Sequence, residues 1–361
     1  MQQLTEPVPI IRLTALAHGG GCGCKIAPGL LADILRTAPI RLPEALIVGA
    51  DNNEDAAVYR ISEHQAVVAT TDFFTPIVDD PRDFGRIAAT NAISDIYAMG
   101  ATPIFALGIL GMPVNTLPVD VIRQITDGGM AACAEAGIPV AGGHSIDTVE
   151  PIYGLVVIGL VDPAHVKRNN GARVGDRLIL GKPLGVGVLG AALKQGHLDA
   201  DGYAQMLDYT TRLNRPGIDL ARLPGVHALT DVTGFGLAGH LLEMCRGARV
   251  HARIDWPAIP FIQTAIPHVK AGISTGASAR NWAGYGHEVT LPGKIHDWQR
   301  QLLTDPQTSG GLLVACDPAD EASVLQIFRS HGFHAAATIG TVTEGIPGMT
   351  LEGNLEQLHA V

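Results

Sequence analysis

A polar stretch at residues 163–175 divides the chain into two apolar halves, and this division limits the possible folds more than any other feature. A chain of 361 residues exceeds what one hydrophobic core usually serves, so two domains of about 100 to 200 residues each are expected. Each half mixes short strand-like runs with helical stripes, which favours α+β domains over a doubly wound sheet. We therefore expect an N-terminal arm at residues 1–47 and α+β domains at 48–162 and 171–350.

The elements of both halves can be predicted from their periodicity. Residues 83–99 have helical spacing, with small and apolar side chains along one stripe, and Gly100 ends the run. Residues 139–141 predict a strand that enters a turn at Gly142–Gly143–His144. Further helices are expected at 121–136, 204–213 and 237–245, and further strands at 66–71, 104–110, 152–161, 177–180, 228–230, 250–254, 311–315 and 335–342.

Composition and charge narrow the class of protein. Hydrophobic residues make up 47% and charged residues 17%, which excludes a disordered chain. The net charge of -10 disfavours nucleic-acid and anionic-membrane partners, which select basic surfaces. The apolar runs are shorter than the ~20 residues that cross a bilayer, and residues 1–9 contain no basic residue of a secretory signal. The five cysteines are scattered along the chain, which suggests that their thiols are reduced. Together with the short apolar runs and the N-terminal sequence, this predicts a cytoplasmic protein.

Residues 18–25 read His-Gly-Gly-Gly-Cys-Gly-Cys-Lys and place two thiols and an ammonium group among four glycines. A thiolate is the nucleophilic form of cysteine, and Lys25 favours it by lowering a free-thiol pKa of ~8.5. The glycines allow this segment to swing or to fold closely over a bound charged group. A flexible tail is the alternative, but Cys22, Cys24 and Lys25 favour a reactive arm. Zinc is not expected, because no second cysteine pair completes a site.

Aspartates at strand ends form the stronger signal for a ligand site. Asp55, Asp72 and Asp231 each follow an apolar strand-like run, where side chains from several strands can converge on a ligand. Asn91 and Asp95 are spaced i,i+4 and share one helix face. Mg²⁺ prefers carboxylate oxygen and bridges carboxylates to phosphates. Turn, cap or solvated-face roles are the alternatives for each residue, but their number favours a metal site with Asp95 as its best ligand.

Three glycine-containing segments differ in how well they match known phosphate-binding patterns. Residues 142–145 offer successive backbone N–H groups that could form an anion-binding concavity, although an ordinary glycine turn is commoner. Residues 185–190 match G-x-G-x-x-G, but no acidic residue follows on a later strand, so a packing role is favoured. Residues 305–311 predict a tight turn before a strand.

The arm motif closely resembles the active-site arm of the selenophosphate synthetase (selenide, water dikinase) family. The resemblance rests on Gly-Cys-Gly-Cys-Lys-Ile-Ala-Pro at 21–28 and continues, in order, through residues 70–74, 88–95, 141–145, 230–236 and 305–311. It implies two mixed domains of the aminoimidazole ribonucleotide synthetase-like type, preceded by a flexible glycine-rich arm. It also implies a homodimer whose sheets combine, with the glycine-rich segment of one subunit near the other's site.

The resemblance further implies an ATP-dependent reaction in which ATP, selenide and water give selenophosphate, orthophosphate and AMP. Cys22 would handle selenium or assist its attack, and Lys25 would meet the developing negative charge. The implied Mg²⁺ ligands are Asp55, Asp95 and Asp231. The implied ATP contacts are Lys25, Asn52, Asn53, Glu54, Asp72, Asp95, Gly143, His144 and Ser145.

Two alternatives stay open at this point. An aminoimidazole ribonucleotide synthetase or a thiamine-phosphate kinase would share the aspartates and residues 305–311, but neither needs a Cys-Gly-Cys-Lys arm. A non-catalytic selenium or sulfur carrier would use Cys22 and Cys24 and would leave the acidic residues without a purpose.

Overall fold

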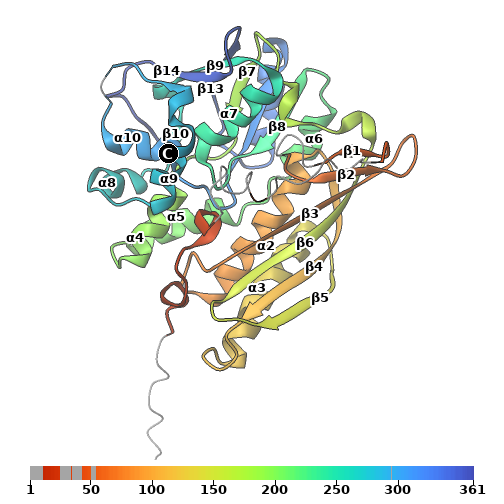
Figure 1. Cartoon of the computed structure of the whole chain (residues 1–361), viewed down its shortest axis with the longest axis vertical. Coiled ribbons are helices and arrows are strands. Elements are labelled where there is room, and N and C mark those ends of the chain that lie inside the picture. Colours follow the sequence, from red (N-terminus) through yellow and green to blue (C-terminus); the bar gives the residue numbers. More distant parts are fainter. Residues whose placement is uncertain (1–10, 25–33, 35–42, 50–53, 294) are drawn as a thin grey trace, which may run out of the picture.

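The computed structural model describes residues 11–24, 34, 43–49, 54–293 and 295–361. Each half of the chain forms a sheet with its own helices, and the two halves pack against each other (Figure 1). The first sheet ends at Val161 and the second begins at Arg177. The predicted α+β class with two mixed domains is therefore confirmed.

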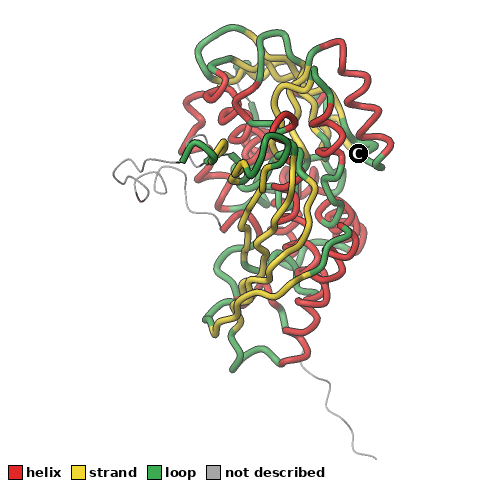
Figure 2. The backbone as a smooth tube through the Cα atoms, turned by 90° about the vertical axis from the view of Figure 1, so that its right-hand side faces the viewer, coloured by secondary structure: helices red, strands yellow, loops and turns green. Residues whose placement is uncertain are grey.

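Among the described residues, six strands form the sheet of the first half, in the order β1-β2-β3-β6-β4-β5. All neighbouring strands are antiparallel except β4 and β5, which are parallel. Helices α2 and α3 pack together and cover one face of this sheet (Figure 2). The bounds are β1 (Leu46–Val48), β2 (Ala57–Arg60), β3 (Ala66–Phe74), α2 (Pro81–Ala98), β4 (Thr102–Met112), α3 (Val119–Ala136), β5 (Val140–Asp147) and β6 (Ile152–Val161).

Helix α2 confirms the helix predicted at 83–99 and places the candidate site residues at the centre of the molecule. Asp80 caps its first turn by accepting a 2.9 Å hydrogen bond from the Asp83 backbone N–H. Burial of Phe84 and Ile87 fixes its apolar stripe against the sheet and α3. Asn91 and Asp95 follow on the same helix and are also buried.

Strand β5 corrects one prediction, because Gly142, Gly143 and His144 lie within a strand and form no turn. The parallel register shifts between Ala106 and Gly108, where β4 and β5 approach closely. A Cβ atom at Gly143 would lie only 2.0 Å from the Gly108 carbonyl oxygen, and its φ of +152° is one that L-residues rarely adopt. These glycines therefore permit close strand contact.

The second half holds a larger sheet, which in the described chain has the order β11-β14-β9-β13-β7-β12-β8. The two helices and five strands predicted for this half all occur near the expected residues. The bounds of the strands in this sheet are β7 (Arg177–Leu180), β8 (Val226–Asp231), β9 (His251–Asp255), β11 (Val289–Thr290), β12 (Leu312–Cys316), β13 (Ala337–Thr343) and β14 (Gly348–Glu352). Two further strands, β10 (Pro260–Phe261) and β15 (His359–Ala360), form a separate parallel pair. The helices of the second half are α4 (Val186–Lys194), α5 (Ala200–Thr210), α6 (Pro216–Arg222), α7 (Gly236–Ala248), α8 (Ala265–Lys270), α9 (Gly276–Tyr285), α10 (Asp297–Thr304) and α11 (Glu321–Ser330).

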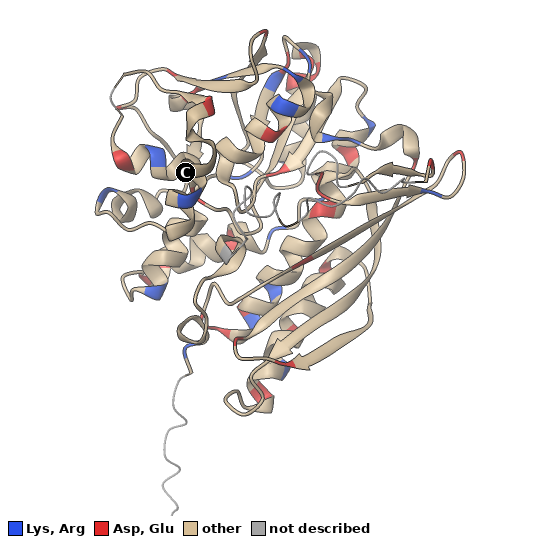
Figure 3. Cartoon of the chain, viewed as in Figure 1, with Lys and Arg blue, Asp and Glu red and all other residues tan. Residues whose placement is uncertain are grey.

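Charged residues of both signs are interspersed over both halves (Figure 3). In the part of the chain that the structure describes, no helix is long and apolar enough to cross a membrane.

Candidate functional site

The described end of the arm is folded between the two halves of the molecule. A short 3₁₀ helix, η2 (Gly21–Cys24), lies between α2 and the helices of the second half (Figure 1). The Cys22 backbone N–H donates a 3.1 Å hydrogen bond to Thr308 Oγ1, and the Gly21 N–H donates one of 3.0 Å to the Thr75 carbonyl. A Cβ atom at Gly21 would lie 2.2 Å from Thr308 Oγ1, so only glycine fits there. Cys22 is 1% exposed and therefore shielded from solvent.

A single amide joins the Cys22 thiol to the acidic residues. Cys22 Sγ lies 3.2 Å from Asn91 Oδ1, and Asn91 Nδ2 donates a 2.8 Å hydrogen bond to Asp72 Oδ2. Asn91 Oδ1 also accepts a 2.7 Å bond from the Ser309 backbone N–H. The side chain of Asn91 is thus held by bonds from three directions. The structure brings Cys22, Asp72 and the face of α2 that carries Asp95 into one site.

The three predicted metal ligands are contributed by different elements. Asp95 comes from α2, Asp231 ends β8, and Asp55 precedes β2. Each carboxylate accepts a hydrogen bond from a hydroxyl group. The donors are Thr70 for Asp95, Ser94 for Asp231 at 2.5 Å, and Thr230 for Asp55 at 3.0 Å.

The electrostatics of this group favour a bound cation. Burial raises the pKa of Asp55 well above its usual range, and the negative charges of Asp231 and Asp95 raise it further. The buried Asp55 Oδ2 has no hydrogen-bond partner among the described residues. No three His, Cys, Asp or Glu side chains among the described residues are arranged to enclose a metal ion. A hard cation would relieve both the repulsion among these buried carboxylates and the lack of a partner at Asp55 Oδ2.

Glu54 lies at the rim of this group. Its Oε2 accepts a 3.0 Å hydrogen bond from the Asn169 backbone N–H, and burial raises its pKa. The predicted residues Lys25, Asn52 and Asn53 lie outside the described residues.

The predicted ATP contacts on β5 lie apart from the carboxylates within one subunit. Gly143, His144 and Ser145 are exposed on the edge strand, whereas Asp72 is on β3. Strands β6 and β4 lie between β3 and β5 in the sheet. A single chain does not bring these two groups together.

Several site residues were not predicted from the sequence. Asn214 Nδ2 donates hydrogen bonds to Ser94 Oγ at 2.7 Å and to the Gly310 carbonyl at 2.8 Å. Lys182 is 2% exposed and donates a 2.8 Å bond to the Ser309 carbonyl, and burial lowers its pKa to about 7. These contacts join residues more than 90 positions apart in the chain, so no local pattern signals them.

The segment at 305–311 gains a structural role that its sequence did not indicate. Asp305 Oδ2 accepts hydrogen bonds from the backbone N–H groups of Gly187 at 2.9 Å and Val188 at 3.3 Å. Gln307 Oε1 accepts two more, each of 3.2 Å, from the residues just before them. These side chains cap the first turn of α4, whose own N-cap is a glycine. Burial raises the pKa of Asp305 to about 7. The capped turn positions Thr308 against the Cys22 segment.

Both halves of the chain match known protein-family models. A family model described as "AIR synthase related protein, N-terminal domain" matches residues 53–161. A second model, "AIR synthase related protein, C-terminal domain", matches residues 173–350.

Curated relatives are similar over nearly the whole chain. The selenide, water dikinase of Paraburkholderia xenovorans (strain LB400) is 62% identical over 335 residues, which cover 92% of this chain and 95% of that protein. The selenide, water dikinase of Pseudomonas straminea is 61% identical over 340 residues, which cover 93% and 95%. Among solved structures, a thiamine-monophosphate kinase from Stenotrophomonas maltophilia K279a has a TM-score of 0.61 at 20% identity, covering 90% of this chain and 95% of that one. The last likeness concerns the fold alone.

Proposed function

Because the chain belongs to the selenide, water dikinases within the AIR synthase related family, we propose that the site around Cys22 converts ATP, selenide and water into selenophosphate, orthophosphate and AMP. The observation that carries the proposal is the chain of contacts from the Cys22 thiol through Asn91 to Asp72. It joins a selenium-handling group to the acidic group in which a nucleotide's metal ions would be held. A thiamine-phosphate kinase shares the fold but needs no such thiol.

Cys22, Asn91 and Lys25 have different roles in the proposed phosphoryl transfer. Such transfer needs positioning and charge neutralisation more than covalent protein chemistry. Cys22, which is buried and held at its backbone by Thr308, presents selenium out of contact with water. Asn91 orients the thiol. Lys25, three residues further along, meets the negative charge that develops on the transferred group.

Asp55, Asp95 and Asp231 would hold Mg²⁺, which neutralises phosphate charge when it is bound. Support for this assignment comes from the unpartnered Asp55 oxygen and from the mutual repulsion of three carboxylates in a buried site. Asn52, Asn53, Glu54 and Asp72 would contact ATP near these ions.

The activity is tested by separating adenine nucleotides after incubation of the protein with Mg²⁺ and ATP, with and without selenide. We expect AMP to form only when selenide is present. Accumulation of ADP in a selenide-independent reaction would contradict the proposal.

The first prediction concerns the metal site. We expect Asp95→Asn to weaken Mg²⁺-dependent ATP binding about tenfold, because it removes one charge from a hard-cation site while keeping its shape. Titration calorimetry at low Mg²⁺ measures the effect, and excess Mg²⁺ should partly restore affinity. Asp83→Asn is the matched control, since it removes one charge from the same helix at a carboxylate that instead accepts a 2.7 Å bond from Tyr203. Equal ATP affinities for both variants and the parent protein would make Asp95 a structural residue.

A homodimer would place Gly143, His144 and Ser145 of one subunit at the nucleotide of the other. Two features support this arrangement. The outer edge of β5 pairs with no described strand, and Phe73, Ile104 and Ile146 expose apolar side chains on the first sheet. We also propose a cytoplasmic location, where thiols such as Cys22 stay reduced.

The second prediction tests the dimer. We expect Ile146→Lys to halve the molar mass measured by light scattering, because it places a charge in an apolar interface. Ile346→Lys is the control, since Ile346 is 86% exposed in the second half of the chain. A monomeric parent protein, or an unchanged mass for Ile146→Lys, would refute an interface at this edge.

A further inference from the structure

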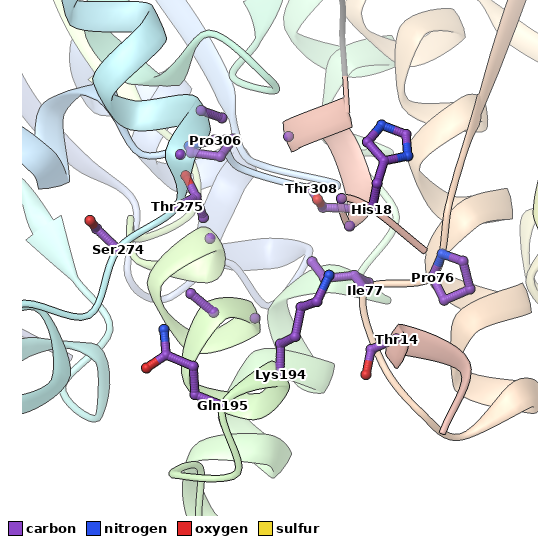
Figure 4. Close-up of a pocket in the computed structure, with 18 of the residues that line it drawn as sticks. Thr14, His18, Pro76, Ile77, Lys194, Gln195, Ser274, Thr275, Pro306 and Thr308 are labelled. Carbon is purple, nitrogen blue, oxygen red and sulfur yellow. The ribbon is translucent and has the colours of Figure 1, made fainter. Parts of the chain in front are cut away.

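A cavity of about 590 Å³ lies beside the Cys22 segment, and neither Asn91 nor the three carboxylates are among its described lining residues. Its walls come from the arm, from α4, from the start of α9 and from the 306–308 turn (Figure 4). Gly20 and Gly23, which flank Cys22 along the chain, both line it. Thr308, which holds the Cys22 backbone, lines it as well.

The charges of the cavity are opposite to those of the carboxylate group. Lys194 and Arg280 line it, together with His18, whose Nδ1 lies 2.7 Å from the Glu150 carboxylate. No Asp or Glu is among its described lining residues. Figure 4 shows Lys194 extending from α4 toward the arm. Within the described chain, neither Lys194 nor Arg280 forms an ion pair. The start of α9 adds the positive end of a helix dipole at the same wall.

Both unpaired cations bind the arm through neutral acceptors. Lys194 Nζ donates a 2.9 Å hydrogen bond to the Ala17 carbonyl, and an Arg280 guanidinium nitrogen donates a 3.1 Å bond to the Gly23 carbonyl. These two contacts bracket Cys22 in the sequence. A carbonyl compensates a full positive charge less well than an anion does, so both groups keep affinity for an anionic ligand.

The volume of the cavity is much larger than selenide requires, so we expect a larger ligand. A water molecule occupies about 30 Å³ of liquid, and the hydrogen selenide ion, which has one heavy atom, is of similar scale. Cavities of about 300 to 1,000 Å³ typically hold organic molecules of drug or metabolite size. A site that lacks carboxylates is equally unsuited to ATP with its Mg²⁺ ions.

We propose that this cavity is a second binding site, separate from that of ATP, for a small organic anion carrying a carboxylate or phosphate group. Lys194 and Arg280 bind the anionic group, and the apolar wall formed by Pro76, Ile77 and Pro306 packs against its organic part. Because Lys194 and Arg280 also hold the chain on either side of Cys22, binding of a ligand in the cavity is coupled to the position of the Cys22 segment. The inference rests on the proposed function, since it adds a ligand beside the thiol that handles selenium.

The test is titration calorimetry on the full chain in EDTA, which disables the carboxylate site. Two probes distinguish the sources of such an anion: AMP, which is the organic product of the reaction, and glutathione, a thiol peptide with carboxylates. Adenosine serves as the neutral control. We expect one of the two anions to bind with 1:1 stoichiometry and adenosine not to bind. Arg280→Gln and Lys194→Gln should each weaken that binding about tenfold, in line with the loss of one charge-assisted hydrogen bond.

Arg123→Gln is the matched control, because Arg123 is exposed on α3 and pairs with Asp120. The proposal fails if neither anion binds, if Arg123→Gln has the same effect as the cavity variants, or if Asp95→Asn in EDTA weakens binding instead. Selenide-dependent AMP release by the unmodified protein is measured separately. Its absence would overturn the proposed function while leaving the binding result intact.

Discussion

Cys22→Ser should lower selenide-dependent AMP release by on the order of 1,000-fold or more, as expected for the loss of a nucleophilic side chain. A serine hydroxyl can still donate a hydrogen bond to Asn91 Oδ1, at the position where the thiol lies 3.2 Å away. The backbone bond to Thr308 does not depend on the side chain. The variant should therefore fold and bind ATP as the parent protein does. It lacks a thiolate, which a hydroxyl cannot replace at neutral pH.

Cys24→Ser is the matched control, and we expect a milder effect from it. Initial rates of AMP formation and calorimetric ATP affinities are compared for both variants. A Cys22→Ser protein that forms selenophosphate at a near-normal rate would show that the thiol does not take part in the reaction.

Lys25→Met should reduce kcat by on the order of 100-fold and change ATP binding much less. Lys25 directly follows η2, whose backbone is held between the two halves of the chain. A contact that forms mainly in the transition state lowers kcat, whereas a uniform binding contact raises KM. One well-placed positive charge in a water-excluded phosphoryl-transfer site supplies an effect of this size.

Steady-state kinetics at saturating selenide, with ATP varied, separates the two possibilities. Lys270→Met is a suitable control, because that side chain lies over the Trp298 ring in the second half and does not line the cavity. A normal kcat with only a raised KM for ATP would assign Lys25 to ground-state binding.

Local periodicity was sufficient to predict the main elements of the fold. The spacing of apolar residues in 83–99 predicted α2, which the structure buries on all sides from Ile87 to Ala98. The same helix carries Asn91 and Asp95. The turn predicted at Gly142–His144 was wrong for a physical reason. Glycines serve close strand contact as well as turns, and the neighbour that requires Gly143 is Gly108, which lies 35 positions earlier.

The candidate site was only partly predictable, because its contacts join distant segments. Cys22, Asp72 and Asp95 could be proposed from the sequence, but the burial of Cys22 depends on Thr308, 286 residues away. The roles of Asp305 and Gln307 could not be predicted either. They cap a helix more than 115 positions earlier, and that helix begins with a glycine and offers no cap of its own.

Phosphorus NMR of the products formed from ATP, with and without selenide, tests the central claim most directly. The assignment of a selenide, water dikinase predicts a product with a phosphorus–selenium bond, accompanied by orthophosphate and AMP, and predicts that this product is absent when selenide is omitted or when Cys22 is replaced by serine. A spectrum that shows only ADP and orthophosphate, whether or not selenide is present, would contradict it.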